Sequence, residues 1–198
     1  MEGFLAHPLG DGHVLHVGAL PPTLRPDAAG FEALWALHPA DYHVISMHGR
    51  SVATPRWQQA YGADYRYTGQ TNRARPLTPE MEPFLTWTRS AIDGRLNGLL
   101  FNWYDAERRH YIGKHRDSRI GMIDGAPIVT ISLGATRTFR IRPWRGQGAL
   151  DFEARDGAVF VLPYAANLVF THEVPHTARC HGRRISITVR GFTDGAPS

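Results

Sequence analysis

The sequence predicts a mainly β protein, an antiparallel sandwich or jelly roll, preceded by an extension of helices and loops. After Gly98 the chain consists of short β-type runs separated by turn residues, with no helical periodicity between them. Such runs indicate antiparallel sheets that pack face to face. The chain has 198 residues, of which 42% are hydrophobic and 20% charged. This suffices for a single domain over residues 1–198 with a sizeable core, and it excludes a mostly disordered chain.

Residues 1–97 are predicted to form the N-terminal extension. Short apolar pieces such as 13–17 could be edge strands, 31–37 is typical of a short helix and 42–47 of a strand. A second helix is predicted to open at 78–80, where a capping residue precedes proline, and to end at Gly94. Between these elements, 51–76 shows little periodicity, which predicts a long surface loop or lid.

Residues 98–192 are predicted to form the β core. The expected strands are 99–104, 128–133, 138–141, 150–154, 158–162, 167–171 and 185–192. The last of them alternates strictly from residue 184 onward. Its apolar face carries Ile185, Ile187 and Val189, and its polar face carries Arg184, Ser186, Thr188 and Arg190. The polar face either points to solvent or points inward, where both guanidinium groups need anionic partners because a buried unpaired charge is costly.

A histidine and an aspartate two positions apart, His115 and Asp117, would project from the same face of an extended segment. With a second histidine, such a pair can form the two-His-one-carboxylate set that holds iron and leaves positions open for a co-substrate and O2. The segment 172–181 could supply that histidine. It could instead form a structural zinc site from His172, His176, Cys180 and His181, although the spacing matches no common zinc finger. Ordinary surface or core histidines are a further alternative.

The basic residues are 21 Arg and one Lys, and the formal net charge is +4. The excess of arginine suits anionic ligands, although a GC-rich genome would give the same bias. The single cysteine, Cys180, excludes an internal disulfide and favours a reducing compartment. No signal peptide and no membrane-spanning stretch is readable, so we expect a cytoplasmic protein without membrane contact. We also expect a monomer.

Further motifs stand in a fixed order with the groups described above. They are Pro55-Arg56, Tyr61-Gly62, Asn102-Trp103-Tyr104, His115-Arg116-Asp117, Ile131-Ser132-Leu133-Gly134, His172-Glu173-Val174-Pro175 and the strand from Arg184 to Arg190. Together they resemble the AlkB-like family of iron(II)- and 2-oxoglutarate-dependent dioxygenases over about residues 55–192. The resemblance implies a double-stranded β-helix (jelly-roll) core at 98–192, a nucleotide-recognition lid at about 51–76, and Fe(II), 2-oxoglutarate and O2 as cofactors.

The resemblance also implies roles for individual residues. His115, Asp117 and His172 match the iron ligands, and His172 is preferred to His176 because it heads the His-x-Val-Pro motif. Arg184 matches the residue that pairs with the distal carboxylate of 2-oxoglutarate. Arg190 matches the residue near the metal-proximal carboxylate and the aspartate ligand. Lesser co-substrate contacts are expected from Asn102, Tyr104 and Thr188.

The composition of the predicted lid suits a base-stacking platform beside a phosphate-tracking groove. Its aromatic residues are Trp57, Tyr61, Tyr65 and Tyr67, and its arginines are Arg56, Arg66, Arg73 and Arg75. We expect Arg56, Tyr65 and Tyr67 to bind substrate, together with Ser118 and Arg119, although several of the aromatic residues could pack on the core. Close nucleic-acid repair members of the family carry acidic residues where Ser118 and Arg119 stand here, which leaves the choice of base, and a base substrate itself, open.

The function implied by the resemblance is oxidative demethylation or dealkylation of N-alkylated bases in DNA or RNA, with release of succinate, CO2 and formaldehyde. Nucleic acid is then the expected partner. One alternative is hydroxylation of a small molecule or a protein side chain at the same iron centre. Another, of a different class, is a nucleic-acid-binding jelly roll without catalysis.

Overall fold

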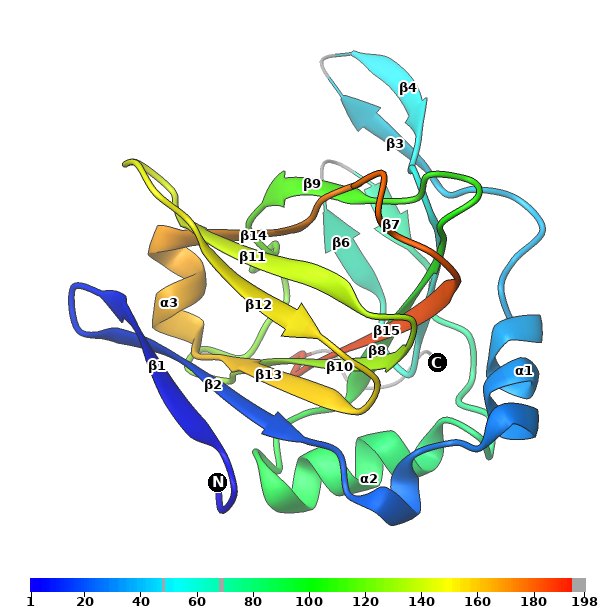
Figure 1. Cartoon of the computed structure of the whole chain (residues 1–198), viewed down its shortest axis with the longest axis horizontal. Coiled ribbons are helices and arrows are strands. Elements are labelled where there is room, and N and C mark those ends of the chain that lie inside the picture. The colour runs from blue at the N-terminus through cyan, green and yellow to red at the C-terminus, as the bar shows by residue number, and fades with distance from the viewer. Residues whose placement is uncertain (48, 68–69, 194–198) are drawn as a thin grey trace.

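The computed structural model describes residues 1–47, 49–67 and 70–193, and two antiparallel sheets form its body (Figure 1). The larger sheet has seven strands in the order β1-β2-β13-β10-β15-β8-β5. These strands are β1 (Leu5–Gly10), β2 (His13–Ala19), β5 (Trp57–Tyr61), β8 (Gly98–Asp105), β10 (Ile128–Gly134), β13 (Ala158–Leu162) and β15 (Arg183–Arg190).

The smaller sheet has four strands in the order β12-β11-β14-β9. They are β9 (Ile112–His115), β11 (Arg137–Pro143), β12 (Leu150–Ala154) and β14 (Phe170–Val174). Two hairpins form sheets of their own, namely β3 (Val44–Met47) with β4 (Arg50–Ala53), and β6 (Tyr65–Tyr67) with β7 (Gln70–Asn72). The predicted mainly β fold with a jelly-roll core is confirmed.

Four short helices complete the described part of the chain: η1 (Pro22–Leu24), α1 (Ala28–Ala36), α2 (Glu82–Ala91) and α3 (Tyr164–Val169). Figure 1 shows α1 and α2 outside the large sheet, whereas α3 leads into β14. None of the helices in the described residues is long and apolar enough to span a membrane.

Strand β8 is buried on both of its faces. Phe101 and Trp103 belong to the apolar cluster that includes residues of α1 and α2, and the Trp103 indole N–H donates a hydrogen bond to the carbonyl of Leu34 at 3.0 Å. The alternate residues Asn102 and Tyr104 point to the other side, toward the small sheet, where they line a cavity. The strand thus separates the apolar core from the candidate site.

The alternating strand β15 lies between β10 and β8, paired with both along most of its length. Its polar face points inward, since Arg184 is 0% exposed and Arg190 is 5% exposed. The solvated-edge interpretation of this strand is therefore wrong.

The N-terminal half contributes more to the sheets than the sequence predicted. Strand β2 is internal, between β1 and β13, and not an edge. Strand β5 pairs with β8 over five positions, so the predicted boundary between an extension (1–97) and a core (98–192) does not divide the large sheet. The stretch 51–76, predicted as a loop, holds β5 and the β6–β7 hairpin.

Two boundaries differ as well. The segment 167–171, predicted as a strand, contains the end of α3 and the beginning of β14. The helix predicted to open at 78–80 begins at Glu82, after a turn in which the N–H groups of Met81 and Glu82 donate to the carbonyl of Thr78.

A backbone test of the fold is available at Gly134, the last residue of β10. Its φ is +81°, and an added Cβ would lie 2.6 Å from both the Arg183 carbonyl oxygen and the Phe31 ring. We expect Gly134→Ala to lower the free energy of unfolding by more than about 1 kcal/mol in chemical denaturation. Gly113→Ala is the matched control, since its added Cβ meets nothing within 4 Å. Equal stability of the two variants would contradict the strand geometry described here.

Candidate metal centre

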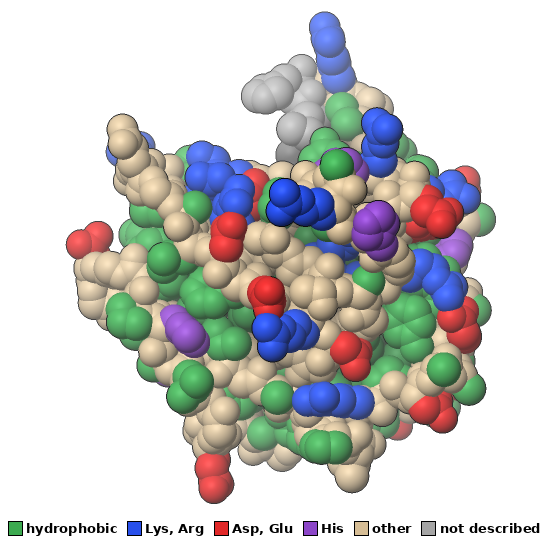
Figure 2. All heavy atoms as spheres, in the orientation of Figure 1, with side chains coloured by type: hydrophobic (Ala, Val, Ile, Leu, Met, Phe, Trp, Pro, Cys, Tyr) green, Lys and Arg blue, Asp and Glu red, His purple; other side chains and the backbone are tan. Residues whose placement is uncertain are grey.

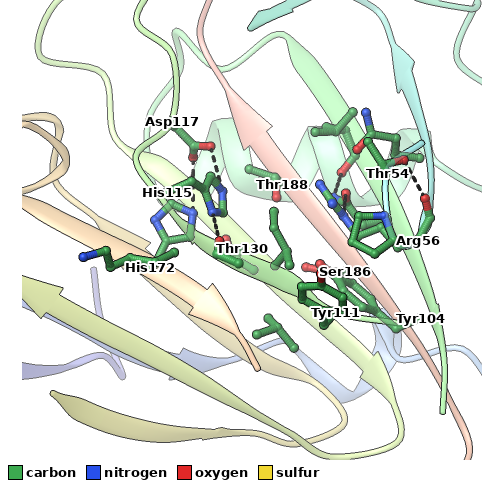
Figure 3. Close-up of a pocket in the computed structure, with 18 of the residues that line it drawn as sticks. Thr54, Arg56, Tyr104, Tyr111, His115, Asp117, Thr130, His172, Ser186 and Thr188 are labelled. Carbon is green, nitrogen blue, oxygen red and sulfur yellow. Dashed lines mark hydrogen bonds and ion pairs between the residues drawn. The ribbon is translucent and has the colours of Figure 1, made fainter. Parts of the chain in front are cut away.

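Three potential metal ligands meet at the edge of the small sheet. His115 ends β9, Asp117 follows two residues later, and His172 lies in β14 directly opposite His115 in the strand pairing. Their candidate ligand atoms all lie within 4.8 Å of one another, and Figure 3 shows the three side chains converging at one end of a cavity. Two imidazoles and one carboxylate in this arrangement can hold a divalent metal ion and leave positions free on it.

The orientation of His115 is fixed by the backbone. Its Nδ1 donates a hydrogen bond to the Gly113 carbonyl at 2.8 Å, which directs Nε2 toward Asp117, 3.7 Å from Oδ1. Nε2 of His172 lies 3.8 Å from the other carboxylate oxygen. Both separations are too long for hydrogen bonds, so the lone pairs of the two Nε2 atoms remain available to a metal ion.

Burial sets the protonation of the three side chains. Desolvation and then the neighbouring His172 lower the pKa of His115 to about 3, and desolvation likewise lowers the pKa of His172. Burial alone would raise the pKa of Asp117, but Arg190 and the two histidines outweigh it and hold that pKa below its ordinary value. Two neutral imidazoles and a carboxylate are the forms that bind a metal ion at neutral pH.

Asp117 is held at both its backbone and its side chain. Its N–H donates to Oδ1 of Asn167, and Nδ2 of Asn167 donates to its carbonyl, both at 3.0 Å. Arg190 Nη2 donates to Asp117 Oδ1 at 2.5 Å. Asp117 Oδ2 and His172 Nδ1 are buried without a partner among the described residues. An uncompensated buried carboxylate oxygen at this position fits a metal ligand.

A cavity of about 440 Å³ extends from these three side chains between the two sheets. The inward face of β15 lines it, as do Asn102, Tyr104 and Thr130 of the neighbouring strands. Asn102, Tyr104 and Thr188, predicted as co-substrate contacts, are thus brought together with Arg184, Arg190 and the three potential ligands.

Arg184 is fully buried at the cavity wall. Its Nε donates to Ser132 Oγ at 2.8 Å and its guanidinium lies 5.1 Å from the centre of the Tyr104 ring. Burial lowers the pKa of Arg184 to about 10, so the group stays protonated at neutral pH. Nη1 and Nη2 have no partner among the described residues. Because a buried cation needs an anion, two free nitrogens in a fork fit a bound carboxylate, as 2-oxoglutarate would supply.

The structure places only some of the predicted substrate residues in the cavity. Arg56 is 7% exposed and lines the cavity, with Nε donating to Asn102 Oδ1 at 2.7 Å, so it does not lie in a surface groove that tracks phosphates. Ser118 lines the same cavity, and Arg119 lines an adjoining surface pocket. The side chain of Tyr67 lies outside the described atoms.

The predicted stacking platform is wrong for three of its aromatic residues. Trp57, Tyr61 and Tyr65 are 6%, 3% and 0% exposed. The Tyr65 hydroxyl donates to the carbonyls of Gly98 and Thr188, at 2.9 Å each, so its ring belongs to the core and is not open to a base. The alternative, that these residues pack on the core, holds because the loop predicted for this region is in fact two pieces of sheet.

The zinc alternative is also wrong. Among residues 1–47, 49–67 and 70–193, the group of His, Cys, Asp or Glu side chains close enough to share a metal ion consists of His115, Asp117 and His172. Of the proposed zinc set, only His172 is part of it.

Several site residues were not predicted. Ser186 and Thr130 line the cavity, Gln58 lies in its wall and Tyr111 at its rim. Ser186 stands on the polar face already recognised in the sequence, and Gln58 follows Arg56 by two positions, a period that would have been visible had 57–61 been predicted as a strand. No sequence signal points to Asn167, whose role depends on the contact of α3 with residue 117.

Comparisons with known proteins support the interpretation of this site as a metal centre. Residues 35–190 match the model of the 2OG-Fe(II) oxygenase superfamily. The chain is 26% identical over 157 residues to the DNA oxidative demethylase ALKBH2 of Homo sapiens, which covers 74% of this chain and 60% of the human protein. The Mus musculus ALKBH2 is also 26% identical over 157 residues, covering 65% of its length. The chain thus spans about 60% of the length of these relatives.

Two solved structures share the fold. The structure of OsALKBH1 has a TM-score of 0.63 and 16% identity, covering 95% of this chain and 100% of the other. An oxidoreductase of the 2OG-Fe(II) oxygenase family from Burkholderia pseudomallei has a TM-score of 0.56 and 21% identity, covering 91% and 86%. Both similarities support the jelly-roll architecture.

The Asn167 pair provides a test of how the metal site is held. Asn167→Leu leaves the buried N–H and carbonyl of Asp117 without partners, and we expect it to weaken Fe(II) binding roughly 10- to 100-fold in an anaerobic titration. Asn97→Leu is the matched control, because Asn97 makes the same two-bond pair with the Phe192 backbone, away from the three ligands. An equal loss of affinity in both variants would show a general effect on stability.

Proposed function

Because the chain belongs to the 2OG-Fe(II) oxygenase superfamily, we propose that it oxidatively dealkylates N-alkylated bases of DNA or RNA. It is an AlkB-like dioxygenase, and its cofactors are Fe(II), 2-oxoglutarate and O2. When bound, they supply the oxidation of a substrate C–H bond, and an N-methyl group that is hydroxylated is lost as formaldehyde. The chain supplies the positions of these groups and the cavity that holds them.

We assign the metal to His115, Asp117 and His172. The support is the convergence of their ligand atoms, the neutral state of both imidazoles and the unpartnered Asp117 oxygen. Arg190 has a positioning role, since its ion pair with Asp117 fixes the carboxylate that faces the two histidines.

We assign the distal carboxylate of 2-oxoglutarate to Arg184, and further contacts to Asn102, Tyr104 and Thr188. The observation that carries the proposal is that one cavity contains both the three metal ligands and a fully buried guanidinium with two unpartnered nitrogens. A dicarboxylate held by that fork would lie in one pose relative to the metal.

The surface around the cavity supports nucleic acid as the substrate. A second pocket of about 420 Å³ adjoins the metal loop, lined by Lys114, Arg116, Arg119 and Trp144. Arg116 lies 4.2 Å from the centre of the Trp144 ring, which is 44% exposed. Figure 2 shows Lys and Arg side chains gathered over the upper part of this face, where Figure 1 places β9 and the β3–β4 hairpin. Cations beside an exposed aromatic ring suit phosphates and unstacked bases.

The sequence also left two other functions open. A non-catalytic jelly roll is set aside, because members of the family are dioxygenases and the three ligands are present. Hydroxylation of a small molecule or a protein side chain stays an alternative, supported by Ser118 and Arg119 in place of acidic residues. A cytoplasmic location and a monomeric state remain predictions.

The role of Arg184 is tested by the dependence of turnover on 2-oxoglutarate. Arg184→Met removes the buried cation, and we expect the KM for 2-oxoglutarate to rise roughly hundredfold or more. Arg184→Lys keeps the charge but loses the two-nitrogen fork of the guanidinium, so its KM for 2-oxoglutarate should lie between those of the wild type and Arg184→Met. The control is Arg183→Met, since Arg183 pairs with Glu32 at the surface. An Arg184→Met enzyme with the KM of the control would refute the assignment.

The proposed function itself is tested by product analysis. Succinate and formaldehyde are followed over single-stranded DNA, duplex DNA and RNA that carry N-methylated bases, with unmethylated strands as controls. We expect equal amounts of both products on at least one methylated strand, and neither product from an Asp117→Ala variant. Succinate without formaldehyde on every strand would instead favour the alternative with a different substrate.

A further inference from the structure

The single cysteine of the chain lies in the loop that joins β14 to β15. This loop, residues 175–182, follows the strand that carries His172 and precedes the strand that carries Arg184 (Figure 1). Cys180 is a free thiol and is partly exposed, so a small molecule can reach its sulfur from solvent. It is not among the residues that line the cavity of the candidate metal centre. Its chemistry is therefore separate from that of the cavity.

Thr177 contacts the thiol from within the same loop. The N–H of Cys180 donates to the Thr177 carbonyl at 3.1 Å, and the Thr177 hydroxyl oxygen lies 3.0 Å from the Cys180 sulfur. A hydroxyl in this position can donate to a thiolate while its lone pairs accept a hydrogen bond from another molecule. Thr177 is exposed, so a molecule that approaches the sulfur from solvent can also meet this hydroxyl.

A buried guanidinium lies on the inner side of the thiol. Arg137, at the start of β11, is 3% exposed, and it has no carboxylate partner among the described residues. Its Nη2 donates to the carbonyl of Gly182 at 3.2 Å, in the same loop as Cys180. Its Nε has no partner in the described part of the chain. A buried cation with a free donor indicates an anionic or oxygen-bearing ligand, because an unmet buried charge is costly.

The two neighbours favour the thiolate form of Cys180. Burial alone would raise the pKa of the thiol, but the hydrogen bonds of Thr177 and Arg137, with the charge of Arg137, outweigh it and hold that pKa below its ordinary value. The thiolate is the nucleophilic form of cysteine, and reactive cysteines are partly exposed in electropositive surroundings. The chain has no second cysteine, so no internal disulfide can consume this thiolate.

A thiolate between a hydroxyl and a guanidinium suits reaction with a hydroperoxide. The sulfur attacks one oxygen of hydrogen peroxide, an S–O bond forms, the O–O bond breaks, and its electron pair leaves with the other oxygen as hydroxide. The thiolate is thereby oxidised by two electrons to a sulfenic acid, and the peroxide is reduced by two. Negative charge develops on the leaving oxygen, and Thr177 and Arg137 are the donors beside the sulfur that can stabilise it.

We propose that Cys180 is a peroxide-reactive thiol that hydroperoxides oxidise to a sulfenic acid, and that Thr177 and Arg137 activate it. The inference concerns a second site of this protein. It does not rest on the proposed dioxygenase function, and the oxidant it requires is the hydroperoxide alone.

The test follows oxidation of the full chain by hydrogen peroxide at neutral pH. Metal is first removed with a chelator, so that iron consumes no peroxide, and the sulfenic acid is trapped with dimedone and measured by intact mass. We expect a second-order rate constant at least about tenfold above that of glutathione under the same conditions. Cys180→Ser should give no dimedone adduct.

Variants of the two neighbours test how the thiol is activated. Thr177→Val keeps the shape of the side chain without its hydroxyl, and Arg137→Met removes the buried charge. We expect each to lower the rate constant by about tenfold or more, and to raise the midpoint pH of alkylation by iodoacetamide, which reports the thiolate fraction.

Two further variants separate this effect from a change of fold. The matched control is Arg140→Met on the same strand, whose side chain pairs with Asp151; its rate constant should equal that of the wild type. Arg137→Lys keeps the charge but loses the planar fork, so its rate constant should lie between those of the wild type and Arg137→Met. If Arg137→Met does not fold, Thr177→Val and Arg137→Lys decide the result, since the first alters an exposed side chain and the second retains the buried cation.

The outcomes are distinguishable from one another. A wild-type rate constant no greater than that of glutathione overturns the inference. A fast wild type, whose rate constant and alkylation midpoint are the same in the folded Thr177 and Arg137 variants, overturns the roles of these two residues. Neither result bears on the proposed function, because the reaction is measured without metal and outside the cavity.

Discussion

The buried ion pair between Arg190 and Asp117 ties the large sheet to the candidate metal centre on the small one. Both side chains are 6% exposed, so the loss of either would leave a charge buried alone, which is among the costliest defects a fold can carry. Arg190 ends β15, an inner strand of the large sheet between β10 and β8, and Asp117 follows β9 at the edge of the small sheet. The position of the carboxylate relative to the two histidines therefore depends on how the sheets are spaced. Tyr65 reinforces the pair, since its ring lies 4.6 Å from the Arg190 guanidinium and its hydroxyl is bonded to two carbonyls of the large sheet.

Strand β15 has two roles that alternate residue by residue. Ile185, Ile187 and Val189 are fully buried in the apolar core, and the residues between them form the wall of the cavity. A shift of one residue in its pairing would place isoleucine in the cavity and arginine in the core, so the hydrophobic pattern also fixes the register of the site. The pairing with β8 places Asn102 opposite Ser186 and Tyr104 opposite Arg184, which brings the neighbouring polar side chains to the same wall.

The predictable parts of this molecule are those with a strong local pattern. The alternation of β15, the His-x-Asp pair and the strands 150–154 and 158–162 were visible in the sequence, and the structure has these two strands at the same bounds. The stretch 167–171 was misassigned because a short apolar run fits a helix end as well as a strand. Tyr65 was misassigned for another reason. An aromatic residue beside charged residues looks the same in the sequence whether its ring faces solvent or the core, and only the packing of the β6–β7 hairpin against β8 and β15 decides it. Arg56 was predicted to bind substrate from a surface lid, and its depth in the cavity could not be known without the pairing of β5 with β8.

The arginines form two groups that differ in burial. Many arginines outside the core pair with a nearby carboxylate, as the half-buried Arg140 does with Asp151 and the exposed Arg73 with Asp64, and such surface pairs contribute little to stability or recognition. The buried arginines are Arg56, Arg137, Arg184 and Arg190, and among the described residues only Arg190 has a carboxylate partner. A guanidinium that the fold buries without an anion is costly, and this cost is recovered only when a ligand supplies the missing acceptor. For Arg184 we propose that this ligand is 2-oxoglutarate, the dicarboxylate that the family uses. The charge that bears on function is therefore held in a few buried side chains, and the net charge of +4 says little about it.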